Sequence, residues 1–108
     1  MLTLDMKNFS EVIQREKKPV MVEFWAPWCG YCQRLSATYD EVAEEYKDAF
    51  VIGKVNVDDA MALAKKYQVE IIPTILIFEK GELVRRVVNP PDKAAIVAFM
   101  MAKRLARL

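Results

Sequence analysis

Two short, almost uninterrupted apolar runs, 20–25 and 74–78, constrain the fold of this chain more than any other feature of its sequence. The first is rich in β-branched and aromatic residues, and the second is strongly apolar. Such runs are typical of strands that are buried on both faces of a sheet. Because a sheet of this kind is covered on both sides, the two runs predict a layered fold with helices above and below the strands.

The segments around these strands show helical and strand patterns in alternation. Apolar residues at helical spacing predict a first helix over 9–16, ended by the residues 17–19, and a second helix from Cys32 onward. The other predicted elements are a strand over 51–57, a short helix capped by Asp58 or Asp59, a hairpin turn over 79–82, a returning strand over 83–88 and a last helix whose cap and early prolines come from 89–92.

The order of these elements predicts the fold class. Strands that alternate with helices pair in parallel, and the late hairpin adds an antiparallel pair. We therefore expect an α/β fold with a mixed central sheet of about four strands and helices on both faces. A chain of 108 residues is long enough for one core and too short for two, so residues 1–108 are expected to form a single domain.

The charges of the chain nearly cancel, with 16 basic and 15 acidic residues. This balance argues against nucleic acid or an anionic membrane as the main partner, because binding to phosphates needs a basic excess. A local basic cluster at Lys103, Arg104 and Arg107 is interpreted as cations that complement the C-terminus of a helix. No apolar run reaches the length that spans a bilayer.

The first seven residues lack a basic start followed by a long apolar stretch, so no secretory signal is predicted. The expected location is the cytoplasm, where thiols are kept reduced and a disulfide is more often catalytic than structural. This expectation assumes that Met1 is the native start of the protein.

The only two cysteines, Cys29 and Cys32, lie in the stretch 28–32. A disulfide between them would close almost no loop of the unfolded chain, so it would contribute little as a structural staple. Two thiols separated by two residues can instead close and open a small disulfide ring. The spacing therefore favours a redox couple.

Two other interpretations of this pair are weaker. A zinc site needs four ligands, and the chain offers two cysteines and no histidine, so carboxylates or a second molecule would have to complete it. Buried, inert thiols are the second alternative. Against it, the flanking Trp28, Gly30 and Tyr31 are typical of an exposed turn rather than a core segment.

The chain resembles the thioredoxin family in four blocks of sequence that keep the family's order and spacing. These blocks are 24–32, 54–58, 72–74 and 78–82. A lone pair of cysteines at this spacing would be a weak signal. Here Trp28 precedes the pair, a predicted helix follows it, and Pro73-Thr74 comes about forty residues later. The resemblance covers nearly the whole chain and implies a four- or five-stranded central sheet, thiol-disulfide exchange and no bound cofactor.

By match to the family motif, Cys29 is the nucleophile and Cys32 is the resolving thiol. A helix that starts at Cys29 would direct backbone N–H groups toward its sulfur, and the thiolate is the reacting form. Cys29 would attack a substrate disulfide, and Cys32 would then attack Cys29 and release the reduced substrate. The implied partners are disulfide-containing proteins and an electron donor like thioredoxin reductase, such as a flavoenzyme that uses NADPH.

Glu23 lies inside the apolar run 20–25, where desolvation is expected to raise its pKa. The family carries a buried acid at the matching position, which implies that Glu23 exchanges a proton with Cys32, directly or through water. The resemblance also places Lys54 on the neighbouring strand, where it could pair with Glu23. The alternative is an edge position from which Glu23 reaches solvent.

The resemblance further implies a cis bond before Pro73, with the backbone of this loop facing the cysteine pair. The free backbone of Ile72 could then pair with an extended substrate as an added strand. The residues expected to bind substrate are Trp28, Gly30, Tyr31, Ile72 and Pro73. Ile71 is expected to extend their apolar rim, and its alternative is an ordinary core side chain.

Three residues depart from the usual thioredoxin pattern. Tyr31 replaces a proline that helps to set the reduction potential, and Asn89 replaces a glycine that often lines the substrate surface. Ala37 replaces a proline that kinks the helix after the cysteines, so this helix is expected to be straighter. These changes affect the direction of the reaction and the docking of substrates rather than the chemistry.

Two residues favour opposite directions of the reaction, oxidation or reduction of the substrate. Tyr31 favours the oxidising members of the family, whereas Ile72 before the proline favours the reductases. We expect a monomeric, cytosolic protein-disulfide reductase. The alternatives are an oxidant or disulfide isomerase, a binding module whose thiols are dispensable, and a metal or iron–sulfur carrier in which two chains share a cluster.

Overall fold

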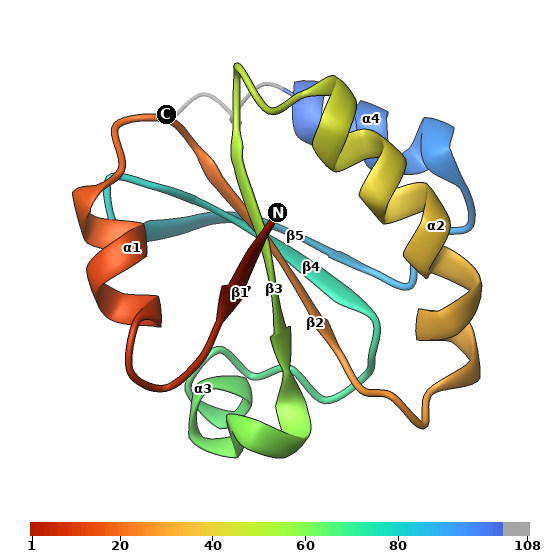
Figure 1. The fold of residues 1–108 in the computed structure, drawn as a ribbon, viewed down its shortest axis with the longest axis horizontal. Helices are drawn as coiled ribbons and strands as arrows, with labels where there is room; N and C mark the ends of the chain where they lie inside the picture. Colours follow the sequence, from red (N-terminus) through yellow and green to blue (C-terminus); the bar gives the residue numbers. More distant parts are fainter. Residues whose placement is uncertain (103–108) are drawn as a thin grey trace, which may run out of the picture.

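The computed structural model describes residues 1–102, in which helices and strands alternate along most of the chain (Figure 1). In chain order the elements are β1 (Leu2–Leu4), α1 (Phe9–Arg15), β2 (Val20–Trp25), α2 (Gly30–Glu45), β3 (Val51–Asn56), the single 3-10 turn η1 (Val57–Asp59), α3 (Met61–Lys66), β4 (Thr74–Glu79), β5 (Glu82–Val88) and α4 (Lys93–Met101). The predicted α/β fold is confirmed.

The five strands form one mixed sheet in the order β1-β3-β2-β4-β5. β3 runs parallel to both β1 and β2, whereas β4 is antiparallel to β2 and to β5. β2 and β4 are therefore inner strands, and in each of them every residue but the last is buried. This position explains why their sequences are apolar on both faces.

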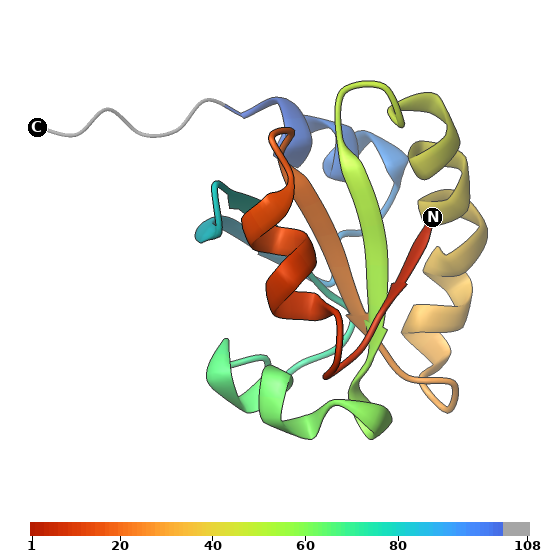
Figure 2. The same ribbon diagram turned by 60° about the vertical axis from the view of Figure 1, so that its left-hand side comes forward.

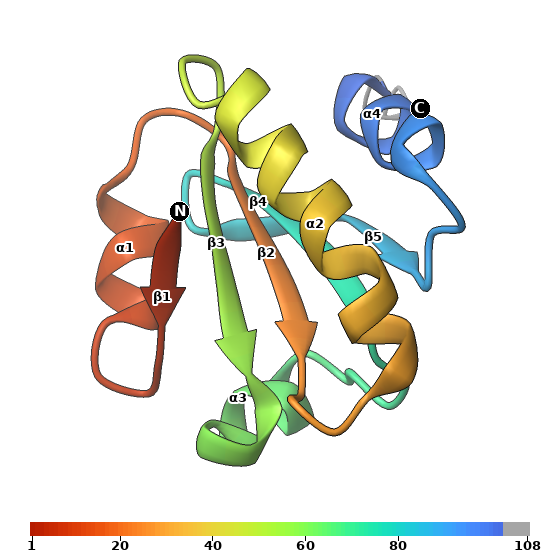
Figure 3. The ribbon, with the colours of Figure 1, turned by 45° about the vertical axis from the view of Figure 1, so that its right-hand side comes forward.

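Helices cover both faces of the sheet, and each face has its own core. Figure 2 shows the sheet between α1 and α2, and Figure 3 shows α2 and α4 side by side on one face. On the α1 and α3 face, Phe9 packs edge-on against Phe24 and Phe78. On the other face, Tyr39 of α2 is buried and donates its hydroxyl hydrogen bond to the carbonyl oxygen of Gly53, 2.9 Å away. The two cores hold the ends of the helices in fixed positions relative to the strands.

The short strand β1 is absent from the elements predicted from sequence, because three residues are too few to show a strand pattern. It pairs with β3, with Leu2 opposite Gly53. A Cβ atom at Gly53 would lie 2.9 Å from the carbonyl oxygen of Leu2, so glycine is what lets this edge strand approach so closely.

The predicted start of one helix is wrong, and that of another is correct only in part. Asp58 and Asp59 do not cap α3: both lie in η1, which is capped by Asn56, and α3 begins after Ala60 without a side-chain cap. At α4 the N-cap is Asp92, which confirms a cap from 89–92, but the two prolines before it lie outside the helix rather than in its first turn. In both places one turn-forming residue competes with another for the same role, and the sequence pattern alone does not rank them.

The predicted basic cluster at Lys103, Arg104 and Arg107 lies outside the described residues. Over residues 1–102, no helix combines the length and the apolar character needed to cross a membrane. The described chain has a Cα radius of gyration of 12.9 Å, close to the value of about 13 Å for a folded chain of about 100 residues.

Candidate active site

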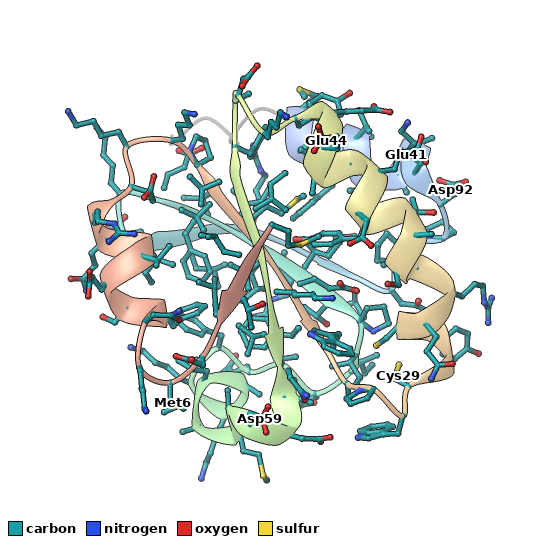
Figure 4. The ribbon with its side chains drawn as sticks, viewed as in Figure 1. Met6, Cys29, Glu41, Glu44, Asp59 and Asp92 are labelled. Atoms are coloured by element: carbon teal, nitrogen blue, oxygen red, sulfur yellow. The ribbon has the colours of Figure 1, made fainter. Side chains whose placement is uncertain are left out.

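The two cysteines lie at the start of α2, directly beyond the end of the central strand β2. Figure 4 shows Cys29 at the opposite end of α2 from Glu41 and Glu44. The turn between strand and helix is held by the Cys29 N–H, which donates to the carbonyl oxygen of Ala26 at 3.1 Å. Cys29 is the N-cap of α2 and Cys32 lies in its first turn. Strand, turn and helix thus fix the positions of both sulfurs.

The sulfur of Cys29 accepts a hydrogen bond from the backbone N–H of Cys32 at 3.2 Å. A thiolate accepts such a bond more strongly than a thiol does, because the acceptor then carries a charge. The dipole of α2 acts in the same direction. Both side chains are nearly buried, with 6% of Cys29 and 3% of Cys32 exposed, and both thiols are free. Of the two sulfurs, only that of Cys29 caps the helix.

Cys32 is held as a neutral thiol by its surroundings. Burial is the main cause that raises the pKa of Cys32 to about 12, and hydrogen bonding to Cys29 adds to the effect. The negative charges that Cys29 and Glu23 can carry raise it further. A thiol in this state becomes a nucleophile only when a nearby base removes its proton.

Glu23 is buried in the middle of β2, between β3 and β4, with 3% of the residue exposed. The alternative of an edge position with access to solvent is therefore wrong. Desolvation raises the pKa of Glu23 to about 7, the positive charge of Lys54 lowers it in part, and Asp40 raises it. Its Oε2 atom has no hydrogen-bond partner in the described structure. A carboxyl group with this pKa can give or take a proton near neutral pH.

Lys54 lies opposite Glu23 in the register of β2 and β3, but it makes no ion pair with Glu23 among the ion pairs of residues 1–102. Its ammonium group instead lies over the ring of Trp25, 4.7 Å from the ring centre. The predicted pair is thus present as a longer-range charge effect and not as a contact. The aromatic face of Trp25 competes with the carboxylate for the same cation.

A cavity of about 220 Å³ brings these groups together beside α2. Its lining residues are Glu23, Trp25, Cys32, Gln33, Ser36 and Lys54. The volume is sufficient for several water molecules, and the unpartnered carboxylate oxygen is the kind of group that binds buried water. Glu23 and Cys32 therefore line the same cavity.

The loop before β4 faces the cysteines from the other side. The Ile72–Pro73 bond is cis, and the carbonyl oxygen of Ile72 lies 3.8 Å from the sulfur of Cys29. The carbonyl of Pro73 accepts a hydrogen bond from the N–H of Asn89 at 2.8 Å, and the hydroxyl of Thr74 donates to the carbonyl oxygen of Ile71. The segment expected to bind substrate is thus held next to the reactive sulfur.

Large apolar side chains are exposed around the cysteines. Trp28 is 68% exposed, Tyr31 55% and Ile71 59%, so the core alternative for Ile71 is wrong. The indole N–H of Trp28 is fixed by the carboxylate of Asp58, at 3.0 Å to Oδ2. Sequence reasoning gave Asp58 a role only as a candidate helix cap and as the end of the block 54–58, and no pattern in the sequence indicated this contact. It also missed Met61, which lines a second cavity with Trp28 and Ile72.

Two of the departures from the family pattern have visible consequences. α2 runs without interruption from Gly30 to Glu45 through Ala37. Asn89 adopts a φ of 47°, in the left-handed region that asparagine tolerates better than most residues. Within residues 1–102, no group of three or more potential ligand side chains is placed to hold a metal ion.

Comparison with known proteins gives a consistent result. The sequence model of the family described as "Thioredoxin" matches residues 1–102. A thioredoxin of Pyropia yezoensis is 38% identical over 93 residues, which cover 86% of this chain and 87% of that protein. Thioredoxin M5, chloroplastic, of Oryza sativa subsp. japonica is 38% identical over 96 residues, which are 89% of this chain and 56% of the rice protein. A bifunctional thioredoxin reductase/thioredoxin of Mycobacterium leprae is 37% identical over 93 residues, 20% of its length.

Proposed function

The chain belongs to the thioredoxin family and is a protein-disulfide oxidoreductase, and on that premise we propose that it works as a cytosolic reductase with Cys29 and Cys32 as its redox couple. Members of the family use the dithiol itself as the redox group, act on disulfide substrates and are reduced by thioredoxin reductase. The observation that carries the proposal is the sulfur of Cys29, which caps α2 beside the backbone of Ile72.

In the first step, the thiolate of Cys29 attacks one sulfur of a substrate disulfide. A bond forms between Cys29 and that sulfur, the substrate S–S bond breaks, and the second substrate sulfur leaves as a thiolate that takes a proton from water. Cys29 itself is largely covered, whereas the neighbouring side chains of Trp28 and Tyr31 are exposed and can contact the substrate. An extended substrate would pair with the backbone of Ile72.

In the second step, Cys32 gives its proton to the carboxylate of Glu23 and attacks the sulfur of Cys29. The Cys29–Cys32 disulfide forms, and the remaining substrate sulfur leaves as a thiol after taking up a proton. The substrate has gained two electrons and the protein has lost two, which a thioredoxin reductase would return. The shared cavity and the high pKa of Cys32 both support this role of Glu23.

A second candidate direction is oxidation or isomerisation of disulfides, and the tyrosine at position 31 favours it. Ile72 before the cis proline favours reduction. Equilibration of the cysteine pair with glutathione buffers separates the two directions, because a reductase holds its disulfide at a lower potential than an oxidant or isomerase does.

The compartment and the oligomeric state belong to this proposal as well. We place the protein in the cytosol, where reduced thiols are the rule, and expect it to act as a monomer. Some similar proteins are named as chloroplastic, and the Mycobacterium leprae protein joins reductase and thioredoxin in one chain. Cell fractionation and light scattering of the purified protein test these two points.

Glu23→Gln is expected to slow turnover by roughly 10²-fold above pH 7, the lower end of what a positioned general base contributes. Below the pKa of about 7, Glu23 is protonated in the native protein, so the two rates should converge there. The measurement is the rate of peptide-disulfide reduction between pH 5 and pH 9. Asp59→Asn, which removes an exposed carboxylate on η1, is the matched control. Equal rates for Glu23→Gln and the native protein at every pH would remove Glu23 from the mechanism.

The same substitution is also expected to change how the stability of the fold depends on pH. At high pH it should lower the activity but remove a loss of stability. The folded pKa of Glu23 is raised above 4.5, so its stabilising contribution is complete below pH 4.5 and is lost as the pH rises through 7. The loss is on the order of 3 kcal/mol. Urea unfolding at pH 5 and pH 8 should show this decrease for the native protein and a smaller one for Glu23→Gln.

A further inference from the structure

Two consecutive arginines on the edge strand β5 each bind the C-terminal end of a different helix. Arg85 faces α4 and donates to the carbonyl oxygens of Met100, at 3.2 Å, and Ala102. Arg86 points to the opposite face of the sheet and donates to the carbonyl oxygens of Tyr67 and Gln68, the latter at 3.1 Å. Neighbouring strand residues point to opposite faces, so one strand reaches both helical layers.

The contact of Arg86 lies at the start of the loop 68–73, and the far end of this loop lies beside Cys29. Helix α3 ends at Lys66, Gln68 turns the chain with a φ of 55°, and the loop then runs to the cis bond before Pro73. The other end of this loop is also held from β5, since the N–H of Asn89 directly after the strand binds the carbonyl of Pro73. β5 and the residue directly after it therefore hold both ends of the loop 68–73.

Helix α3 has six residues, which is too short to be stable without tertiary contacts. The guanidinium group is a rigid fork, and it here bridges two consecutive carbonyl groups that the helix leaves free. It fixes the end of α3 relative to the sheet, and with it the path of the four residues that lead to Ile72. The hydrogen bonds of this contact involve neither Cys29 nor Cys32.

We propose that Arg86 is a positioning residue for substrate binding: by holding the C-terminal end of α3 against β5, it keeps the backbone of Ile72 in place beside Cys29. The inference rests on the proposed function, in which a substrate peptide pairs with Ile72. It predicts a selective defect. Substrates that use the loop backbone lose affinity when Arg86 is replaced, whereas small disulfides that need only the sulfur of Cys29 do not.

The experiment compares two substrates and three variants of the full chain. The substrates are a disulfide-linked peptide and bis(2-hydroxyethyl) disulfide, which is uncharged and has no backbone to pair. Arg86→Met should slow reduction of the peptide about five-fold, through KM rather than kcat, and leave the small disulfide unchanged. Arg86→Lys keeps one donor and should restore part of the loss. Arg85→Met is the matched control, because it removes the same charge and the same kind of helix contact on the other face.

The outcomes separate this inference from the function on which it rests. Failure of the native protein to reduce either disulfide would contradict the proposed function. If the native protein is active, three results would contradict the inference. Arg86→Met could leave the reduction rates of both substrates unchanged, lower both rates equally, or lower the peptide rate no more than Arg85→Met does. Circular dichroism at the assay temperature confirms that each variant is folded.

Discussion

Replacing Cys29 by serine is expected to abolish disulfide reduction, with a loss of roughly 10³-fold or more. The sulfur of Cys29 is the one that caps α2 and lies 3.8 Å from the carbonyl oxygen of Ile72. A serine hydroxyl would keep the cap but is not a nucleophile toward disulfides at neutral pH, because it stays protonated. The measurement is the rate at which reduced protein converts a disulfide-linked peptide into free thiols.

The fold is expected to tolerate this substitution, because serine is a good N-cap residue and nearly the same size. Thermal unfolding of Cys29→Ser therefore serves as the control. A folded Cys29→Ser variant that keeps a tenth or more of the activity would contradict the assignment of the nucleophile. Full biological activity without the thiols would instead support a binding module.

Replacing Cys32 by serine should have an effect of the same size on turnover by a different route. Cys29 still attacks, but no resolving thiol follows, so the protein stops at the mixed disulfide with its substrate. The intact mass should increase by the mass of one substrate half, and a reductant should reverse the increase. The native protein should show little of this adduct, because Cys32 lies in the first turn of α2 next to Cys29.

The Cys29→Ser variant is the matched control for trapping. It retains Cys32, which is 3% exposed and has a pKa raised to about 12, so it should form almost no adduct. An adduct on Cys32 in that variant, or none on Cys29 in Cys32→Ser, would mean that the roles of the two cysteines are reversed. The gel mobility of the adduct gives a second readout of the same result.

Most of the fold could be predicted from sequence because two of its inner strands, β2 and β4, are apolar on both faces. β2 and β4 are the two runs that stand out, and their central positions are the physical reason. β1 could not be predicted, since its three residues depend on the close approach that Gly53 allows. The prediction for the start of α3 is also wrong, because Asp58 and Asp59 lie in the preceding turn, which Asn56 caps.

In the candidate site, too, the features encoded in a short stretch of sequence could be predicted, whereas those that depend on tertiary contacts could not. The cysteine spacing and a carboxylate within an apolar strand are visible in one short stretch of sequence, and the structure brings Glu23 and Cys32 to one cavity. The position of Lys54 depends on a competing ring, that of Trp25. The contacts of Asp58 with Trp28 join segments thirty residues apart, and no periodicity encodes them.

The measurement that tests the central claim most directly is the equilibrium potential of the Cys29–Cys32 pair against a series of glutathione buffers. A reductase should equilibrate near about −270 mV, the value of thioredoxin itself. A value of about −200 mV or above would contradict the account and make the protein an oxidant or isomerase, since protein disulfide isomerase lies near about −180 mV. The oxidised fraction is read from the masses of the alkylated and the disulfide forms.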